Sequence, residues 1–319
     1  MGPTFVDLCG GPGGFSEYVL WRTRNAAAGW GISLDTDDSL RWSLRGNVRS
    51  AVERGHFRLL RGADGTGDLT RPENIAHFAE TVLRATRGRG VDLALADGAF
   101  SVEGRENAQE PLTWRLILCE LLAGLMVLPP GGSLMCKLFD CFEPRTVDLI
   151  YAVGVHFERV ALVKPVSSRP ANSERYLVCK SLRSSPAEIV RWLASWNREL
   201  EAGAPPPWRL LDEDLWTTDR AFAEFIYTCN NQVAERQIRE LGRIEEALSN
   251  PSQTPQRSPS TASLRSECFR SWNLPMSNRP ATPSRRQPQR SRPSNRSGNR
   301  GRSRYESVRS RSLRRQHRR

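Results

Sequence analysis

The fold is decided by a short stretch near the start of the 319-residue chain, Asp7-Leu8-Cys9-Gly10-Gly11-Pro12-Gly13-Gly14-Phe15. It follows an apolar run, Thr4–Leu8, and leads into Ser16–Arg22, which has the composition of a helix. Glycine is needed where the backbone turns sharply from a strand into a helix and where it approaches a ligand with no Cβ in between. A plain tight turn would need fewer glycines, so we interpret this stretch as a ligand-binding loop.

Three kinds of ligand compete for such a loop. A dinucleotide site normally carries G-x-G-x-x-G, whereas this run reads Gly-Gly-Pro-Gly-Gly, and a phosphate-binding P-loop needs a Gly-Lys-Ser/Thr ending that is missing here. The third ligand is S-adenosylmethionine (SAM), whose methionine part is a zwitterion. An acid at the strand end, Asp7, suits its ammonium group, and glycine amides suit its carboxylate. The loop therefore favours SAM.

The remaining pattern indicates strands that alternate with helices. Short apolar runs bounded by Gly, Pro or Asp predict four buried strands, Thr4–Leu8, Gly29–Leu34, Val91–Ala96 and Ser133–Phe139. Such alternation predicts a parallel sheet with crossover helices. Two further runs, Arg159–Lys164 and Arg175–Lys180, are separated by the loop Pro165–Glu174, which predicts an antiparallel hairpin at the sheet edge. The expected class is α/β, a Rossmann-like sheet with a C-terminal hairpin that is typical of SAM-dependent methyltransferases.

Composition divides the chain into four parts. We expect a core, a helical extension that ends in the amphipathic run Phe222–Leu248, a linker with a short docked segment at Leu264–Leu274, and a disordered Arg/Ser-rich tail, over residues 1–182, 183–249, 250–276 and 277–319. The tail holds fifteen Arg, one Glu and no Lys, a net charge of +14, whereas the whole chain carries +12. The rest of the chain therefore sums to −2, which excludes a strongly basic nucleic-acid clamp in the folded part on net charge alone.

Cysteine usage and hydropathy restrict the compartment. The seven cysteines show no C-x-x-C spacing and most lie in apolar runs, which indicates a reducing compartment without a disulfide framework or a zinc site. No stretch approaches 18 apolar residues, and Met1 is followed by a strand-like segment and not by a signal peptide. We expect a soluble intracellular protein with no membrane partner and no bound metal.

Two further acids lie where an adenosine could bind. Asp35 follows the second predicted strand, a common place for an acid that binds the ribose, although 35–38 could equally be a solvated turn. Asp68 precedes the helix predicted to begin near Pro72, and it either caps that helix or holds the adenine amino group. The two roles of Asp68 are compatible.

Three residues suggest acid–base chemistry. Asp97 ends the third predicted strand, and ligand crevices of open α/β sheets lie at such carboxyl ends. Lys137 lies inside the next strand, in a chain with only three Lys against forty-four Arg. A desolvated Lys can lose its proton near neutral pH whereas an Arg cannot, so Lys137 is a candidate general base for a ribose hydroxyl. Glu174, at the start of the final strand, is placed to orient that amine. The other two lysines, at strand ends, are expected to be solvated: Lys164 and Lys180.

In this order, the glycine loop, Asp97, Lys137 and Glu174 resemble the FtsJ-type (RrmJ-type) RNA 2′-O-methyltransferases. Four longer strings narrow the resemblance to the eukaryotic cap-specific mRNA 2′-O-methyltransferases: Gly13–Arg22, Gly67–Ile75, Ala96–Gly104 and Ser168–Tyr176. The similarity runs over about residues 4–275, and strings of this length are too specific to arise by chance.

The resemblance implies SAM-dependent methylation of the ribose of the first transcribed nucleotide of capped mRNA, from cap-0 to cap-1, in the nucleus. It implies Asp97, Lys137 and Glu174 as the catalytic set, with Lys137 as general base. The tail would add salt-sensitive RNA binding or contacts with the transcription and capping machinery. SAM would contact Asp7, Cys9, Gly10, Gly11, Pro12, Gly13, Gly14, Phe15, Asp35, Asp68 and Leu69, and the capped RNA would contact Asn107, Ala108, Gln109 and Asn172.

The chain departs from the family in its catalytic set. The family's set is Lys-Asp-Lys-Glu, and its first Lys lies upstream of the glycine loop, whereas none of the six residues before Asp7 is Lys. Three explanations stay open at this stage: a truncated gene model, a loss of activity, or a partner that supplies the missing part. The alternative function is therefore a non-catalytic relative that binds RNA or SAM.

Overall fold

The computed structural model describes residues 2–35, 40–99, 102–212, 216, 218–249 and 261–272. By its internal contacts the chain divides into two units, Met1–Gln253 and Thr254–Arg319. In the second unit the structure describes one helix, α9 (Thr261–Ser271), which begins three residues before the predicted short segment at Leu264–Leu274. The predicted tail, 277–319, and most of the predicted linker lie outside the described residues.

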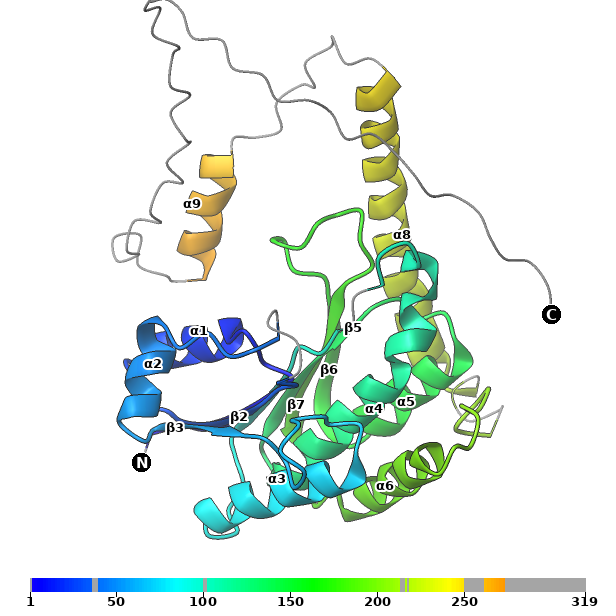
Figure 1. Ribbon diagram of the computed structural model, residues 1–319. Helices are drawn as coiled ribbons and strands as arrows, with labels where there is room; N and C mark the ends of the chain where they lie inside the picture. Colours follow the sequence, from blue (N-terminus) through cyan, green and yellow to red (C-terminus); the bar gives the residue numbers. More distant parts are fainter. Residues whose placement is uncertain are drawn as a thin grey trace, which may run out of the picture. The chain divides into compact units, whose positions relative to one another are not determined.

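The first unit is built on a seven-stranded sheet in the order β3-β2-β1-β4-β5-β7-β6 (Figure 1). The pairs from β3 to β5 are parallel, and β7 pairs antiparallel with both β5 and β6. The predicted hairpin is thus confirmed. Its second strand lies inside the sheet and its first strand at the edge. The strands are β1 (Thr4–Leu8), β2 (Ala28–Ile32), β3 (Phe57–Leu60), β4 (Leu93–Ala96), β5 (Ser133–Leu138), β6 (Phe157–Val163) and β7 (Arg175–Leu182).

The sequence analysis did not predict β3. β3 has only four residues, Phe-Arg-Leu-Leu, and it pairs on one side only, with β2, at the other edge of the sheet. A run this short with a charged residue inside carries almost no periodic signal. β2 and β4 are also shorter than expected, because the predicted ends at Leu34 and Val91 lie in the flanking loops.

Helices cover both faces of the sheet, because successive strand residues point to opposite sides. On one face, Phe5 of β1 belongs to a small cluster with residues of two helices, α1 (Gly14–Arg22) and α2 (Gly46–Glu53). On the other face, the neighbouring Val6 belongs to the large core. That core is covered by α3 (Pro72–Ala85), α4 (Gln109–Val127), α5 (Pro144–Gly154) and α6 (Ala187–Glu201), and residues of the long helix α8 (Arg220–Ser249) also join it.

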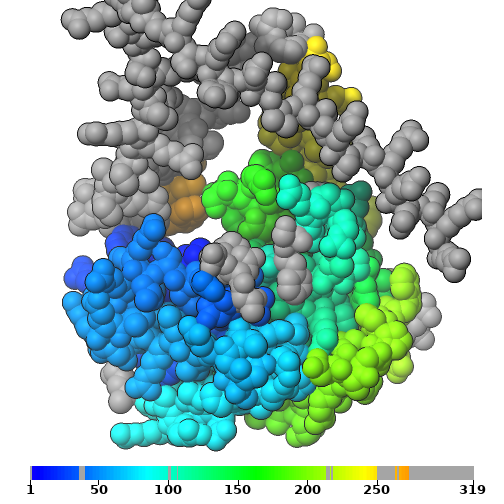
Figure 2. Space-filling view, viewed as in Figure 1, coloured from blue at the N-terminus to red at the C-terminus, as the bar shows by residue number. Residues whose placement is uncertain are grey.

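Proline fits the first turn of α3 and α5, where an N–H has no helical partner in any case. Figure 2 shows the surfaces of α3, in cyan, and α6, in yellow-green, side by side on one face of the molecule, and the two helices are in contact. α4 lies against β1, β4 and β5 and is buried around most of its circumference. It is therefore the central helix of the fold.

The strand order also locates the site. The chain runs outward from β1 to β2 and β3, then returns to the other side of β1 with β4. The carboxyl ends of β1 and β4 therefore flank the point where the order reverses, which is where open α/β sheets bind ligands. Asp7 lies near the end of β1 and Asp97 directly follows β4.

Candidate active site

Asp7 links the strand before the glycine turn to the helix after it. This side chain is fully buried, and its Oδ2 accepts hydrogen bonds from Ser16 N at 3.1 Å and Ser16 Oγ at 2.5 Å. Burial raises the pKa of Asp7 to about 7, against the opposing hydrogen bonds from Ser16. Its Oδ1 is buried and has no partner among the described residues. Oδ2 thus fixes the turn, and Oδ1 stays a candidate for the predicted contact with a cofactor ammonium.

Gly11 needs its hydrogen side chain, because a second loop lies directly against it. Its N–H donates to Ser33 Oγ at 3.2 Å, and this hydroxyl donates to the Leu40 carbonyl at 3.0 Å. A Cβ on Gly11 would lie 1.7 Å from that carbonyl oxygen, whereas a Cβ on Gly14 would meet nothing within 4 Å. The turn is thus packed on one side and open at the start of α1, as a loop that presents its backbone to a ligand must be.

The two acids predicted to contact adenosine are held in different ways. Asp35 pairs with Arg41 Nε at 3.2 Å and Arg61 NH1 at 2.6 Å, so its carboxylate already has two cationic partners. Asp68 Oδ1 accepts from Thr70 N at 2.8 Å and Thr70 Oγ1 at 2.7 Å. The N-cap of α3 is Arg71, which has no side-chain cap, so the predicted capping role of Asp68 is wrong and its carboxylate shapes the loop before the helix.

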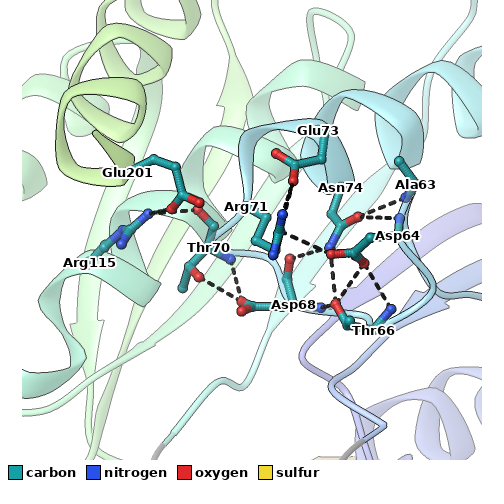
Figure 3. A network of polar contacts seen from close by, with 10 residues as sticks. All are labelled: Ala63, Asp64, Thr66, Asp68, Thr70, Arg71, Glu73, Asn74, Arg115 and Glu201. Atoms are coloured by element: carbon teal, nitrogen blue, oxygen red, sulfur yellow. Dashed lines mark hydrogen bonds and ion pairs between the residues drawn. The ribbon is translucent and has the colours of Figure 1, made fainter. Parts of the chain in front are cut away.

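A residue missed by the sequence analysis organises that loop. Asn74 of α3 is fully buried, and its Oδ1 accepts from Ala63 N at 2.8 Å and Asp64 N at 3.1 Å (Figure 3). Its Nδ2 donates to the Asp68 carbonyl at 2.9 Å. Leu69 belongs to the large core, and the residue as a whole is 1% exposed, so its side chain is not available to a cofactor.

The structure brings the predicted catalytic residues together. Lys137 Nζ lies 2.8 Å from Asp97 Oδ1 and 3.2 Å from the Asp97 carbonyl oxygen. The Lys137 side chain is 14% exposed, so the amine is largely shielded from water but still accessible. Lys137 also lies directly opposite Tyr176 in the antiparallel β5–β7 pair.

Tyr176 is a second residue that the sequence analysis missed. Its hydroxyl lies 2.9 Å from Asp97 Oδ1 and 2.9 Å from Glu174 Oε1. Its ring packs edge-on against the ring of Phe15 in the glycine turn, with 5.9 Å between the two ring centroids. Burial, with the two neighbouring carboxylates, raises the pKa of Tyr176 well above its usual value. The phenol is therefore neutral, and its one proton can be donated to either of the two carboxylates that it lies between.

Glu174 is held as a carboxylate. Partial burial alone would raise the pKa of Glu174, but hydrogen bonds from Ser168, Tyr176 and Asn172 outweigh burial and lower it. The Ser168 hydroxyl donates at 2.8 Å and Asn172 Nδ2 at 3.3 Å, both to Oε2. The predicted catalytic acid and the predicted RNA contact, Asn172, thus belong to one network.

Lys164 contradicts the expectation of a solvated strand end. Its Nζ donates to Asn172 O and Asn172 Oδ1, both at 2.8 Å, and to the Glu174 carbonyl at 3.0 Å. Partial burial lowers the pKa of Lys164, although the Glu174 charge opposes this effect. The loop between β6 and β7 folds back over the strand end and supplies the acceptors that solvent was expected to supply. Lys180, in contrast, is exposed.

The other predicted RNA contacts follow β4. Asn107 and Ala108 lie in the 3-10 turn η1 (Glu106–Ala108), and Gln109 is the first residue of α4. In the next turn, the Glu110 carboxylate accepts from the backbone N–H groups of Phe142 and Glu143, at distances from 3.0 to 3.1 Å. The start of α4 and the loop after β5 are therefore tied together at the carboxyl edge of the sheet, the same edge as Asp97.

Comparison with known proteins now decides the family. Residues 1–182 match the model of the FtsJ-like methyltransferase family. The chain belongs to this family. The match ends at Leu182, where β7 ends. The cofactor of an FtsJ-like methyltransferase is SAM, and the bare backbone of the glycine turn together with the orphaned Oδ1 of Asp7 fits such a ligand.

Three curated relatives show how far the similarity of this methyltransferase extends. Cap-specific mRNA (nucleoside-2′-O-)-methyltransferase 1 from Danio rerio is 40% identical over 274 residues, and the protein of the same name from Homo sapiens is 39% identical over 279 residues. The relative 1A from Caenorhabditis briggsae is 38% identical over 283 residues. The alignments cover 85–86% of this chain, which spans about a third of the length of these relatives (32–33%).

Two negative findings concern the described part of the chain. Within it, no three His, Cys, Asp or Glu side chains are grouped so that they could hold a metal ion. No helix within the same residues is long and apolar enough to cross a membrane. All seven cysteines are free thiols.

Proposed function

We propose that this FtsJ-like domain catalyses SAM-dependent 2′-O-methylation of the first transcribed nucleotide of capped mRNA, from cap-0 to cap-1. The observation that carries the proposal is the contact of Lys137 with Asp97, beside the glycine turn. Tyr176 continues this chain of contacts from Asp97 to Glu174. The names of the relatives, at 38–40% identity over most of the chain, point to the same reaction.

The roles of the side chains follow from their positions. SAM supplies an electrophilic methyl group, and the protein must take a proton from the ribose hydroxyl that receives it. Lys137 Nζ is the base in this proposal: its neutral amine accepts the 2′-hydroxyl proton and becomes an ammonium ion. Asp97 at 2.8 Å stabilises that ammonium ion. Tyr176 and Glu174 fix Asp97 in turn, so that the amine keeps its direction.

The same proposal assigns the substrate contacts. Asn172 lies next to Glu174 in one network, and Asn107 to Gln109 begin the crossover from β4, so both sets flank the carboxyl edge of the sheet. We assign capped RNA to this edge. The Arg/Ser-rich tail lies outside the described residues. In this proposal its positive charge attracts the anionic RNA, and it also contacts the capping machinery and directs the protein to the nucleus.

Lys137→Ala tests the chemistry. We expect it to lower the rate of methyl transfer to capped RNA by at least about 100-fold, because the base is lost. SAM affinity measured by calorimetry should stay within a few-fold of wild type. Lys180→Ala is the matched control, since this exposed lysine lies on the neighbouring strand. An equal loss of SAM binding and methylation in Lys137→Ala would mean that Lys137 is structural, and a wild-type chain that binds SAM and RNA without turnover would mean a binding module.

The tail is tested by deletion of residues 277–319. The deletion removes a net charge of +14, so RNA affinity should fall most at low salt, and the slope of log affinity against log salt should become shallower. Filter binding with capped RNA at several salt concentrations measures both quantities. Unchanged affinity at low salt would exclude a direct role of the tail in RNA binding.

A further inference from the structure

A further carboxyl group lies next to the proposed catalytic residues, on the central helix α4. Glu120 is completely buried, and burial raises the pKa of its side chain to about 8, against an opposing hydrogen bond from the Gly98 N–H. Its Oε1 accepts that N–H at 2.8 Å, and its Oε2 lies 3.8 Å from Cys136 Sγ. Cys9 also forms a hydrogen bond with Glu120. One side chain therefore touches residues at the ends of β1 and β4 and the residue before Lys137 in β5.

The contact with Gly98 connects Glu120 to the proposed base, Lys137, through one peptide group. The peptide group between Asp97 and Gly98 is held at both ends: its N–H donates to Glu120 at 2.8 Å, and its carbonyl accepts from Lys137 Nζ at 3.2 Å. A peptide group is planar, so rotation of one end moves the other. Loss of the Glu120 acceptor would free this peptide to turn and would withdraw one of the two acceptors that direct the Lys137 amine.

The residues around Glu120 are adapted to this contact. A Cβ on Gly98 would lie 2.5 Å from Glu120 Oε1 and 2.8 Å from Leu116 Cδ2, so position 98 must be glycine for the carboxyl group to come this close. Burying a carboxyl group is costly, and an apolar side chain would serve the packing of α4 better. Core packing therefore does not explain a glutamate at this position.

We propose that Glu120 is a positioning residue for methyl transfer, which acts through the Asp97–Gly98 peptide on the amine of Lys137. The inference rests on the proposed function for its kinetic consequence. It assigns to Glu120 no contact with SAM or RNA. Its effect must therefore appear in kcat and not in the affinity for either ligand.

Three substitutions in the full-length chain separate this role from a structural one. Glu120→Leu removes the acceptor, and Glu120→Asp withdraws it by one methylene, so both should lower kcat by about 10- to 100-fold through misplacement of the amine. Glu120→Gln keeps an oxygen acceptor for Gly98 and should recover most of the loss. KM for capped RNA and Kd for SAM should change by less than about threefold. Thr113→Val is the matched control, because within the described residues this buried hydroxyl donates only to carbonyls of its own helix.

A spectroscopic readout tests the link without turnover. The chain has only three lysines, so selective ¹³Cε labelling gives three resonances, which Lys→Arg variants assign. Glu120→Leu should shift the resonance of Lys137, whereas the resonance of the exposed Lys180 should stay unchanged. If the wild type fails to methylate capped RNA, the proposed function fails, and this measurement still tests the contact.

Three results would each overturn the inference. The first is full kcat in Glu120→Leu or Glu120→Asp. The second is a loss in Glu120→Gln as large as in Glu120→Leu, and the third is a Lys137 resonance that does not respond to Glu120→Leu. If Glu120→Leu does not fold, Glu120→Asp and the resonance of Lys137 decide alone.

Discussion

Replacing Glu120 with glutamine should also change how the stability of the methyltransferase depends on pH. Burial raises the pKa of Glu120 from 4.5 to about 8 in the folded protein, whereas the exposed side chain in the unfolded chain titrates near the lower value. Between the two pKa values the folded protein keeps a proton that the unfolded chain has released, so rising pH favours unfolding. The stabilising contribution is fully present below pH 4.5 and is lost progressively as pH rises to about 8.

The magnitude follows from the distance between the two pKa values. Each unit of difference corresponds to about 1.4 kcal/mol, so this group alone should lower the free energy of unfolding of the wild type by about 5 kcal/mol between pH 4.5 and 8. Glu120→Gln has no proton to lose at this position. Asp7, whose pKa burial raises to about 7, is present in both proteins and cancels in the comparison. The stability of Glu120→Gln relative to wild type should therefore rise steadily across the range.

Urea denaturation followed by tryptophan fluorescence at four pH values between 5 and 8 measures this difference. Glu80→Gln serves as the control: Glu80 is 67% exposed and pairs with Arg84 on the surface, so its stability difference from wild type should stay flat. A constant difference between Glu120→Gln and wild type over the whole range would refute the reasoning, because it would show that Glu120 titrates alike in the folded and unfolded chain.

Two further substitutions probe the glycine turn and the phenol. Gly11→Ala should destabilise the protein by more than about 2 kcal/mol, since its Cβ would overlap a backbone carbonyl, whereas Gly14→Ala has open space and should stay within about 1 kcal/mol of wild type in thermal melts. Tyr176→Phe should lower kcat about tenfold with little change in SAM affinity, because it removes the donor between two carboxylates, and an unchanged kcat would contradict that role.

The sequence was informative wherever chemistry and chain order coincide. The glycine turn, Asp97 and Lys137 each lie at or near the carboxyl end of a predicted strand, and the parallel arrangement of those strands is enough to bring them to one edge of the sheet. The hairpin added Glu174 to the same edge. Local periodicity and the rarity of lysine were therefore enough to predict that these four features lie together.

The residues that support the site could not be predicted, because their contacts depend on the paths of loops. Asn74 bonds to the loop before α3, and Lys164 is covered by the loop between β6 and β7. No periodicity in the sequence encodes the path of either loop. Tyr176 alternates with apolar residues in its strand and therefore resembles a core position. Such residues show their role only when the distances are known.

Glu120 illustrates the physical limit most clearly. In the sequence it is one polar residue in an apolar helical run, Leu116–Leu125, and a single glutamate there is equally compatible with a helix face that touches water. What makes it informative is that α4 is buried on nearly every side, so no such face exists at this position and the carboxyl group must be satisfied inside the protein. Its main-chain partner is the Gly98 N–H, and the carbonyl of the same peptide binds the proposed base. A buried carboxyl group without a partner in its own helix is thus better evidence for a supported active site than a conspicuous motif, because only a specific contact offsets its desolvation.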